Sequence, residues 1–433
     1  MRKINFIKSS ALVLLTVLSC GTAFPCSMYK LTVNGITMVG NNEDSWGRDA
    51  SIWFEPGTNG KFGMLCVGYA RKQPNPDGAM NEHGLAFDAF TMHRKPNIPE
   101  KDPNKKDFAY AHIRSIMQQC KTVDEVYAFL EKLNLHILNG SPIFNGGMFL
   151  FVDKSGKYLV VEADKLTLGN DDEFVLANFS IADTKDLTTV KMERYCNGVA
   201  FLKHKTPETS LSFCTALSDT MSVNRAKAGN GTLYTNIYDL HEGLIHLYFY
   251  HDYSQSLTFN LKEELAKGAH SYPLTELFPG NENFRKFLDY KTPQNTRSIF
   301  IFIVACGFLF FFSSVSFMIS FFRSSTISFS FLKPVLSALC MALCVYAFVL
   351  LRNEGIFYFP SPYDDGTSLI VSLTSYLPIV LLISIIPLLM GMVKIFRQQT
   401  WNSFAKWLLV TNNFAYILLL GLFAYWKLFD IFN

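Results

Sequence analysis

The chain has 433 residues, and 39 Lys and Arg residues against 36 Asp and Glu residues give it a formal net charge of +3. So small a positive excess, without a basic stripe along the sequence, argues against a nucleic-acid partner. The composition changes near Thr296: charged, turn-forming and aromatic residues are mixed before it, and long apolar runs dominate after it. We therefore expect a globular domain at residues 26–296 and a membrane domain at residues 297–433.

The first 25 residues have the order of a secretory signal peptide, or leader. A basic start is followed by an apolar run from Ala11 to Leu18 and by small residues up to Ala23. The apolar run is too short to span a membrane as a mature helix. We therefore expect the domain that follows to lie outside the cytoplasm.

Three processing routes are open at the end of this leader. Cleavage by signal peptidase after Ala23 has the preferred small residues at −1 and −3, but it leaves Phe24-Pro25 to be removed by autolysis or trimming. Cleavage after Pro25 would expose Cys26 directly. Lipoprotein-type processing at Cys20 would keep Cys26 internal unless a later cut exposed it.

Cys26 stands where the mature chain is expected to begin. A cysteine in first position carries a nucleophilic thiol and an α-amine with a pKa of about 8, which can take the thiol proton. The alternative is an ordinary cysteine near a processing site. The expected globular domain holds an odd number of cysteines, which leaves at least one outside any disulfide. They are Cys26, Cys66, Cys120, Cys196 and Cys214.

The globular domain reads as strands with helices between them. Asn34-Gly35 predicts a tight hairpin, and Thr122 with Glu125 forms a capping box that opens a helix. The expected strands are 27–33, 36–41, 61–70, 84–92, 148–152, 158–162, 175–180, 232–240 and 244–251, and the expected helices are 108–120, 123–133 and 192–202. Early strands, middle helices and late strands indicate an α+β layered fold.

Four apolar stretches are long enough to cross a membrane: about 298–322, 334–351, 369–393 and 407–426. The first and third connections between them carry Lys and Arg, whereas the second is acidic. The basic connections are therefore expected in the cytoplasm, which places residue 296 and Asn433 outside. Pro378 and Pro387 are expected to kink the third helix. No charge lies within the stretches, which favours an anchor or partner-binding bundle over a transporter.

Six segments of the globular domain, in order, carry a family resemblance. They are the hairpin from Cys26 that continues through Gly40-Asn41-Asn42-Glu43-Asp44-Ser45-Trp46, and residues 80–86, 149–162, 175–178, 193–195 and 232–240. Together they resemble the choloylglycine hydrolase and penicillin V acylase family, N-terminal-nucleophile hydrolases that cut linear amide bonds. The resemblance covers about residues 26–270 and implies a four-layer αββα sandwich.

The resemblance also implies four catalytic residues. Cys26 would attack the amide carbonyl to form a thioester, with its own α-amine as base and then acid. Asp44 would hold that amine, Asn178 would donate its amide to the oxyanion, and Arg194 would favour the thiolate. Without the resemblance, Asp44 reads as a turn former or cap, Asn178 as a strand-end turn residue and Arg194 as a surface arginine.

Two substrate-binding positions depart from the family pattern. Asn41 stands where the family usually has arginine, and Thr91 stands where bile salt hydrolases have a second asparagine. These departures argue against a standard bile salt hydrolase more than against amide hydrolysis. His241, His246 and His251 lack metal-ligand spacing, so no metal site is expected. The implied thioester reaction needs no organic cofactor either.

The sequence therefore predicts a membrane-anchored, extracytoplasmic amidohydrolase with an N-terminal cysteine, acting on a small-molecule linear N-acyl amide. It does not choose the acyl group or the leaving amine. One alternative is an acyltransferase in which an amine replaces water at the thioester. Another is a non-catalytic membrane sensor or binding module, with the helices serving a membrane partner or a homo-oligomer.

Overall fold

The computed structural model describes residues 26–45, 47–69, 76–92, 94–95, 98–140, 146–225, 227–323, 329–364, 368–398 and 401–430. The predicted leader and Asn433 lie outside these residues. The chain divides into two compact units between Leu288 and Asp289. Each unit is described separately.

The first sheet is built around the predicted hairpin. Strand β1 (Cys26–Val33) pairs with β2 (Ile36–Ser45) in antiparallel register, with Cys26 opposite Glu43. Asn34 and Gly35 both have positive φ (52° and 78°), as a two-residue hairpin turn requires. The sheet order is β12-β1-β2-β13-β14-β15, which adds β12 (Glu173–Ala177), β13 (Gly231–Asp239), β14 (Leu244–Phe249) and β15 (Asp252–Asn260).

The second sheet has eight antiparallel strands in the order β11-β10-β9-β6-β5-β4-β3-β16. In chain order they are β3 (Ala50–Glu55), β4 (Met64–Tyr69), β5 (Gly78–Asn81), β6 (Ala86–Met92), β9 (Gly146–Val152), β10 (Tyr158–Val161), β11 (Leu166–Gly169) and β16 (His270–Pro273). A separate parallel pair joins β7 (Lys106–Asp107) to β8 (Leu133–Asn134).

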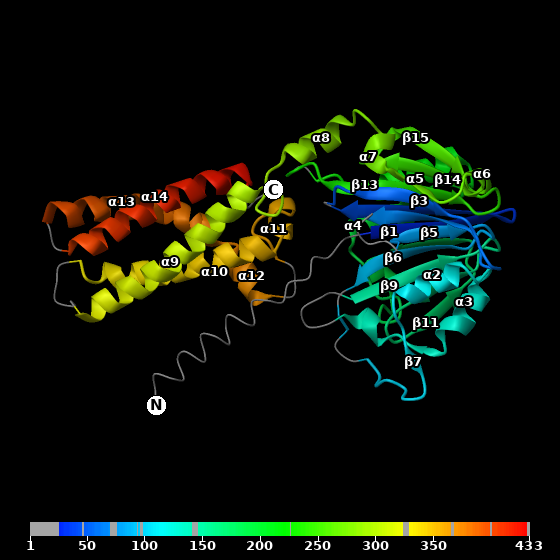
Figure 1. Ribbon diagram of the computed structural model, residues 1–433, viewed down its shortest axis with the longest axis horizontal. Helices are drawn as coiled ribbons and strands as arrows, with labels where there is room; N and C mark the ends of the chain where they lie inside the picture. Colours follow the sequence, from blue (N-terminus) through cyan, green and yellow to red (C-terminus); the bar gives the residue numbers. More distant parts are fainter. Residues whose placement is uncertain are drawn as a thin grey trace. The chain divides into compact units, whose positions relative to one another are not determined.

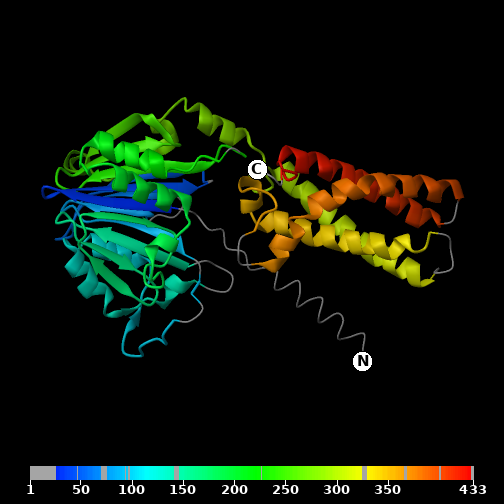
Figure 2. The ribbon, with the colours of Figure 1, turned by 180° about the vertical axis from the view of Figure 1, so that it is seen from behind.

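Helices cover the outer face of each sheet (Figures 1 and 2). On the eight-stranded sheet, α2 (Ala111–Met117) and α3 (Val123–Leu130) bury Ile116, Met117 and Val126 in one core with strand residues. On the six-stranded sheet, α4 (Glu193–His204) and α5 (Leu211–Met221) form a second core with Tyr29 and Ile237. Each fully buried apolar side chain contributes about 1.5–3 kcal/mol. The predicted α+β, four-layer αββα architecture is confirmed.

Local signals anticipated most of these elements, and α3 shows why. Its capping residue Thr122 accepts a hydrogen bond from Glu125 N at 3.3 Å, and the Glu125 carboxylate accepts one from Lys121 N at 2.6 Å. The sequence analysis missed several elements, including β3, β5, α5 and β15. The remaining short helices are α6 (Leu261–Ala266), α7 (Leu274–Leu277), α8 (Glu282–Asp289) and the 3₁₀ turns η2 (His136–Asn139) and η3 (Leu187–Thr189).

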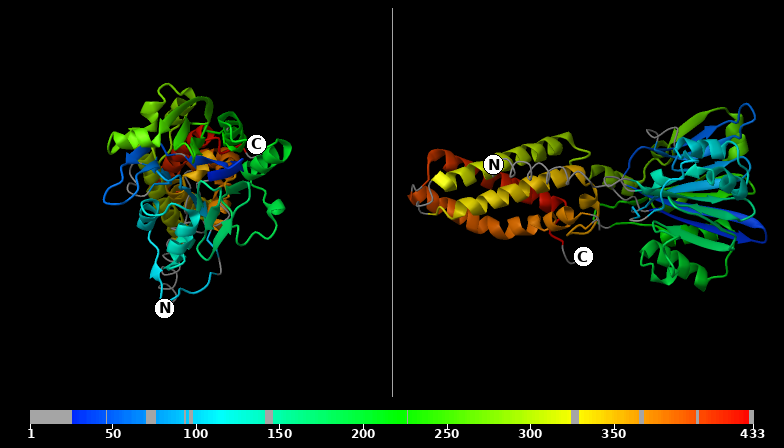
Figure 3. Two further views of the ribbon diagram at one scale, coloured as in Figure 1. Left: turned by 90° about the vertical axis from the view of Figure 1, so that its right-hand side faces the viewer. Right: turned by 90° about the horizontal axis from the view of Figure 1, so that it is seen from below.

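The second unit holds four helices that are long and apolar enough to cross a membrane (Figure 3). They are α9 (Arg297–Arg323), α10 (Leu332–Arg352), the span Leu369–Arg397, built from α12 (Leu369–Thr374) and α13 (Leu377–Gln398), and α14 (Ser403–Tyr425), with the short α11 (Gly355–Tyr358) after α10. The third span breaks at residues 375–376, just before Pro378, while Pro387 lies inside α13.

Buried polar side chains pair between the long helices. Ser314 and Ser337 each donate to the other's backbone carbonyl at 2.8 Å, which joins α9 to α10. Asn412 of α14 donates to Ser313 of α9 at 2.7 Å. Such small and polar contacts are what holds helices together in lipid, where apolar side chains gain little by association.

Candidate active site

Cys26 is the first residue of β1 and is 2% exposed. Its Sγ lies 3.0 Å from Glu43 Oε2, so the thiol donates a hydrogen bond to that carboxylate. Burial, and then the Glu43 charge, raise the pKa of the Cys26 thiol well above its ordinary value. The Cys26 side chain is therefore a neutral thiol at rest.

Asn178 and Arg194 meet at the backbone of Cys26. Asn178 directly follows β12, and the pairing of β12 with β1 sets Ala177 opposite Ser27. Asn178 Oδ1 accepts hydrogen bonds from Cys26 N at 2.7 Å and from Arg194 Nη2 at 2.5 Å. Arg194, in the first turn of α4, also donates through Nε to the Cys26 carbonyl at 3.2 Å.

Thr91, near the end of β6, contacts Asn178 through its backbone carbonyl and not through its side chain. Its carbonyl accepts a hydrogen bond from Asn178 Nδ2 at 2.8 Å. The amide nitrogen that the sequence analysis assigns to an oxyanion is therefore bound to Thr91 here. To act on substrate, that nitrogen would have to exchange the carbonyl of Thr91 for the developing oxyanion.

Asp44 is fully buried on β2, where it stands opposite Thr232 of β13. Thr232 Oγ1 donates to Asp44 Oδ1 at 2.5 Å, whereas Oδ2 has no hydrogen-bond partner in the described part of the chain. Burial raises the pKa of Asp44 to about 6, although the charges of Arg194 and Arg225 and the Thr232 hydrogen bond act in the opposite direction. One oxygen of Asp44 is thus oriented and the other is available to a donor.

Asn41 lies on β2, two residues before Glu43, and is 1% exposed. It is close enough to Asp88 of β6 to lower the pKa of that carboxyl, although its amide atoms reach no partner within hydrogen-bond geometry. Burial and then the charges of Glu43 and Asp77 raise the pKa of Asp88 well above its ordinary value overall. Asn41, which stands where we expected the family's arginine, therefore lies among the carboxyl groups of Glu43, Asp77 and Asp88.

The structure thus brings Cys26, Asn178, Arg194 and Thr91 together, with Asp44 and Asn41 on the neighbouring strand. Sequence reasoning assigned no role to Glu43, Arg225 or Asp88. The alternating side-chain directions along β2 could have indicated Glu43, because Glu43 lies two residues after Asn41 and so shares a strand face with it. No local signal marks Arg225, which follows α5 in a turn.

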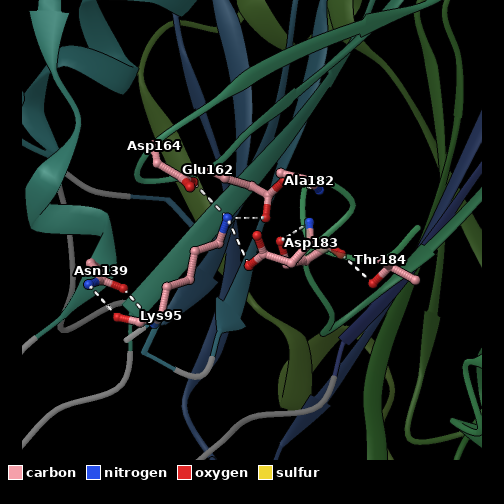
Figure 4. A network of polar contacts seen from close by, with 8 residues as sticks. Lys95, Asn139, Glu162, Asp164, Ala182, Asp183 and Thr184 are labelled. Atoms are coloured by element: carbon pink, nitrogen blue, oxygen red, sulfur yellow. Dashed lines mark hydrogen bonds and ion pairs between the residues drawn. The ribbon is translucent and has the colours of Figure 1, made fainter. Parts of the chain in front are cut away.

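The buried amine of Lys95 forms ion pairs with Glu162 and Asp164 and with the exposed Asp183, five residues after Asn178 (Figure 4). Lys95 Nζ lies 3.1 Å from Glu162, 2.6 Å from Asp164 and 3.4 Å from Asp183. Burial lowers the pKa of Lys95, but the Asp164 and Glu162 carboxylates outweigh it, so that the pKa is raised overall. Glu162 also accepts from the backbone N of Ala182 at 2.9 Å, and Asn139 exchanges two hydrogen bonds with the Lys95 backbone.

Among the described residues, no group of three or more His, Cys, Asp or Glu side chains is arranged to hold a metal ion. The groups that the described residues place around Cys26 are three carboxyls (Glu43, Asp44 and Asp88), two guanidinium groups (Arg194 and Arg225) and the Asn178 amide.

A family model described as acyl-coenzyme A:6-aminopenicillanic acid acyl-transferase matches residues 37–252. This range contains all the site residues described above except Cys26. The globular unit belongs to this family. The predicted resemblance to the choloylglycine hydrolase and penicillin V acylase family is thereby confirmed, because the matching model belongs to that family. Residues 37–252 are called the acyl-transferase family domain below.

Two solved structures are similar to part of this chain. An arginine-to-leucine variant of conjugated bile acid hydrolase from Clostridium perfringens is 17% identical over 57% of this chain and 97% of that chain, with a TM-score of 0.46. Penicillin V acylase from Agrobacterium tumefaciens is 14% identical over 57% of this chain and 91% of that chain, with a TM-score of 0.43. No curated protein matches the chain.

Proposed function

We propose that the protein is a membrane-anchored enzyme that hydrolyses a linear N-acyl amide through a thioester on Cys26. Its family supports the coarser class, an enzyme acting on linear amide C–N bonds. The observation that carries the proposal is the environment of Cys26, whose backbone N contacts Asn178 while Arg194 contacts its carbonyl. No cofactor enters the reaction.

Once Cys26 is the first residue, its backbone nitrogen is an amine. The neutral amine takes the thiol proton while Sγ attacks the acyl carbonyl, and it returns the proton to the leaving amine as the C–N bond breaks. Water then hydrolyses the thioester and restores the thiol. The available oxygen of Asp44 suits the ammonium form of that amine.

Asn178 has two roles in this scheme. Its Oδ1 orients the Cys26 nitrogen, and its Nδ2 donates to the oxyanion after leaving the Thr91 carbonyl. One such donor contributes about 3 kcal/mol to the transition state. Arg194 keeps Asn178 in place through its 2.5 Å hydrogen bond, and its charge lowers the pKa of Asp44.

The four long helices support membrane association. We further propose that residues 1–25 direct export, that the domain from Cys26 to residue 296 is extracytoplasmic, and that the C-terminus lies on the same side. The acidic second connection and the basic first and third connections support this orientation. In a cell with two membranes, such helical spans belong to the inner one.

An acyltransferase is the second candidate, because the family model itself is named for an acyl-transferase. The two reactions share the Cys26 thioester and differ only in whether water or an amine accepts the acyl group. Product analysis with and without added amines separates them: a new N-acyl amide indicates transfer, and the free acid alone indicates hydrolysis.

The test of the proposed function replaces the nucleophile. Cys26→Ala is expected to abolish hydrolysis of N-acyl amides, and Cys26→Ser to abolish it nearly completely, because an alcohol is a weaker nucleophile than a thiol. The measurements are release of free amine and the intact mass of the purified full chain, which shows whether Cys26 is the first residue. Wild-type turnover in the Ala variant, or a wild-type mass that includes Phe24-Pro25, would contradict the proposal. Buried Cys214→Ala is a matched control.

A further inference from the structure

The base that the proposed mechanism uses does not exist before Cys26 is exposed. While a residue precedes Cys26, its nitrogen is an amide, and this amide donates a hydrogen bond to Asn178 Oδ1 at 2.7 Å. An amide nitrogen cannot accept the thiol proton. Cleavage after Ala23, which has the small residues that signal peptidase prefers, leaves Phe24-Pro25 still attached. Removal of these two residues by Cys26 itself therefore needs a different proton acceptor.

Glu43 is placed to be that acceptor. Its Oε2 lies 3.0 Å from Cys26 Sγ, and the carboxylate is only 4% exposed. The position is set by the backbone, because antiparallel pairing of β1 with β2 puts Glu43 directly opposite Cys26. Side chains of directly opposed residues lie on the same face of a sheet, about 4.5–5.5 Å apart at Cβ. Glu43 thus contacts the reacting atom itself.

The other titratable groups around Cys26 and Glu43 are less well placed to accept the thiol proton. The titratable groups whose charges act on Cys26 or that sense Glu43 are Asp44, Tyr69, Asp77, Asp88 and Tyr234. Burial raises the pKa values of Tyr69 and Tyr234, which keeps them neutral and makes them donors rather than acceptors. Asp44 accepts from Thr232 and is oriented by that bond. Within the described residues, Glu43 is the carboxylate in hydrogen-bond contact with the sulfur.

We propose that Glu43 is the base for a self-cleavage reaction in which Cys26 cuts the peptide bond that precedes it. The proposal rests on the proposed function only in requiring that Cys26 become the first residue. The thiol proton passes to the Glu43 carboxylate while Sγ bonds to the Pro25 carbonyl carbon. The C–N bond then breaks, Glu43 returns the proton to the leaving nitrogen, and a Pro25 thioester is left. Water hydrolyses this thioester, so one water is consumed and the thiol is restored.

This assignment divides proton transfer between two groups. Glu43 serves the cleavage that exposes Cys26, and the α-amine created by that cleavage serves later turnover. An α-amine has a pKa of about 8 and must be neutral to act as a base. Amide hydrolysis through the amine should therefore have fallen about a hundredfold at pH 6, whereas self-cleavage does not use the amine and should not follow that decline.

The test follows processing of the full chain in detergent by intact mass. Glu43→Gln, which keeps the size but not the basicity, is expected to accumulate chains that begin at Phe24 and to slow cleavage by about 10²–10⁴-fold. Glu43→Asp keeps the charge on a shorter side chain and is expected to cleave at an intermediate rate. Glu131→Gln, an exposed control, should cleave like wild type. Cys26→Ala should not cleave at all.

A second chain separates this inference from the proposed function and from misfolding. A signal sequence ending in Ala-Xaa-Ala is joined directly to Cys26, so that signal peptidase exposes the cysteine. With Glu43→Gln, this chain should begin at Cys26 and react with iodoacetamide, which shows that the variant folds and exports. With Glu43 intact, it should hydrolyse amides; if it does not, the proposed function is wrong. Wild-type cleavage of the leader-bearing Glu43→Gln chain, or processing of the Cys26→Ala chain, would overturn the role of Glu43 alone.

Discussion

At the scale of single residues, the site is governed by which charges reach the Cys26 sulfur. Asn41 stands where we expected the family's arginine. Burial first, and then the neighbouring carboxyls Glu43, Asp44 and Asp88, raise the pKa of the Cys26 thiol. The thiol is therefore protonated at rest, and a reaction that uses its sulfur as a nucleophile must begin with a proton transfer.

Restoring a positive charge at position 41 should reverse part of this effect. In Asn41→Arg, the guanidinium would stabilise the thiolate and offset Glu43 and Asp88, so the pKa of Cys26 should fall by about one pH unit. The measurement is the rate of Cys26 alkylation by iodoacetamide against pH, and its midpoint should move down. Asn41→Gln adds bulk without charge and should leave the midpoint in place. An unchanged or higher midpoint in the Arg variant would show that position 41 does not act on the sulfur.

At the scale of elements, the site depends on β12 and α4, which both reach the start of β1. Pairing of β12 with β1 delivers Asn178, and the first turn of α4 delivers Arg194. Lys95, Glu162 and Asp183 then tie the segment after Asn178 to the end of β10. No contact of this network with Cys26 is recorded among the described residues, so we expect it to act on the reaction through the position of Asn178.

Removing Lys95 should therefore affect both stability and rate. Lys95→Met leaves the buried Glu162 carboxylate without its partner, and breaking a buried ion pair in this way costs about 3–5 kcal/mol. We expect kcat to fall at least about tenfold and the 180–184 segment to become sensitive to protease, since Asn178 loses its support. Lys101→Met removes an exposed pair with Asp107 and should change neither measurement. Unchanged kcat in Lys95→Met would show that the network does not position Asn178.

At the scale of the whole molecule, the chain joins an acyl-transferase family domain to four helices long enough to span a membrane. The polar pairs between α9, α10 and α14 are internal to the bundle. Such pairs stabilise packing between helices, and none of them is a charged group of the kind that marks an ion path.

The orientation of these helices can be measured with reporters. Alkaline phosphatase joined after Asn433 is expected to be active and green fluorescent protein at the same position dark, because the loop charges place the C-terminus outside. Fusions that end in the first connection, after Arg323, should give the opposite pair of signals. A bright fluorescent C-terminus would mean that the catalytic domain and Asn433 lie on different sides, or that both are cytoplasmic.

Local chemistry in the sequence determined much of the fold and singled out Cys26 as the candidate nucleophile. Asn34-Gly35 specifies a hairpin because both residues accept positive φ, the Thr122 cap starts α3, and apolar length alone marks the membrane helices. The four-residue strand β5 and the helix α5 escaped prediction, since β5 is too short to show a periodic pattern and α5 is capped by Ser210 without the Glu or Gln that completes a capping box.

Only the tertiary structure decided how the site residues meet. Cys26 contacts Asn178, 152 residues away in the sequence, and Arg194, 168 residues away. Local sequence patterns cannot predict contacts between residues so far apart. The register of β1 against β2 and β12 sets which side chains reach the sulfur and which reach the backbone nitrogen. Glu43 lies in a motif that the sequence analysis quoted, but its contact with Cys26 depends on strand pairing. That pairing is fixed by burial of both sheet faces, a property of the assembled layers and not of any one segment.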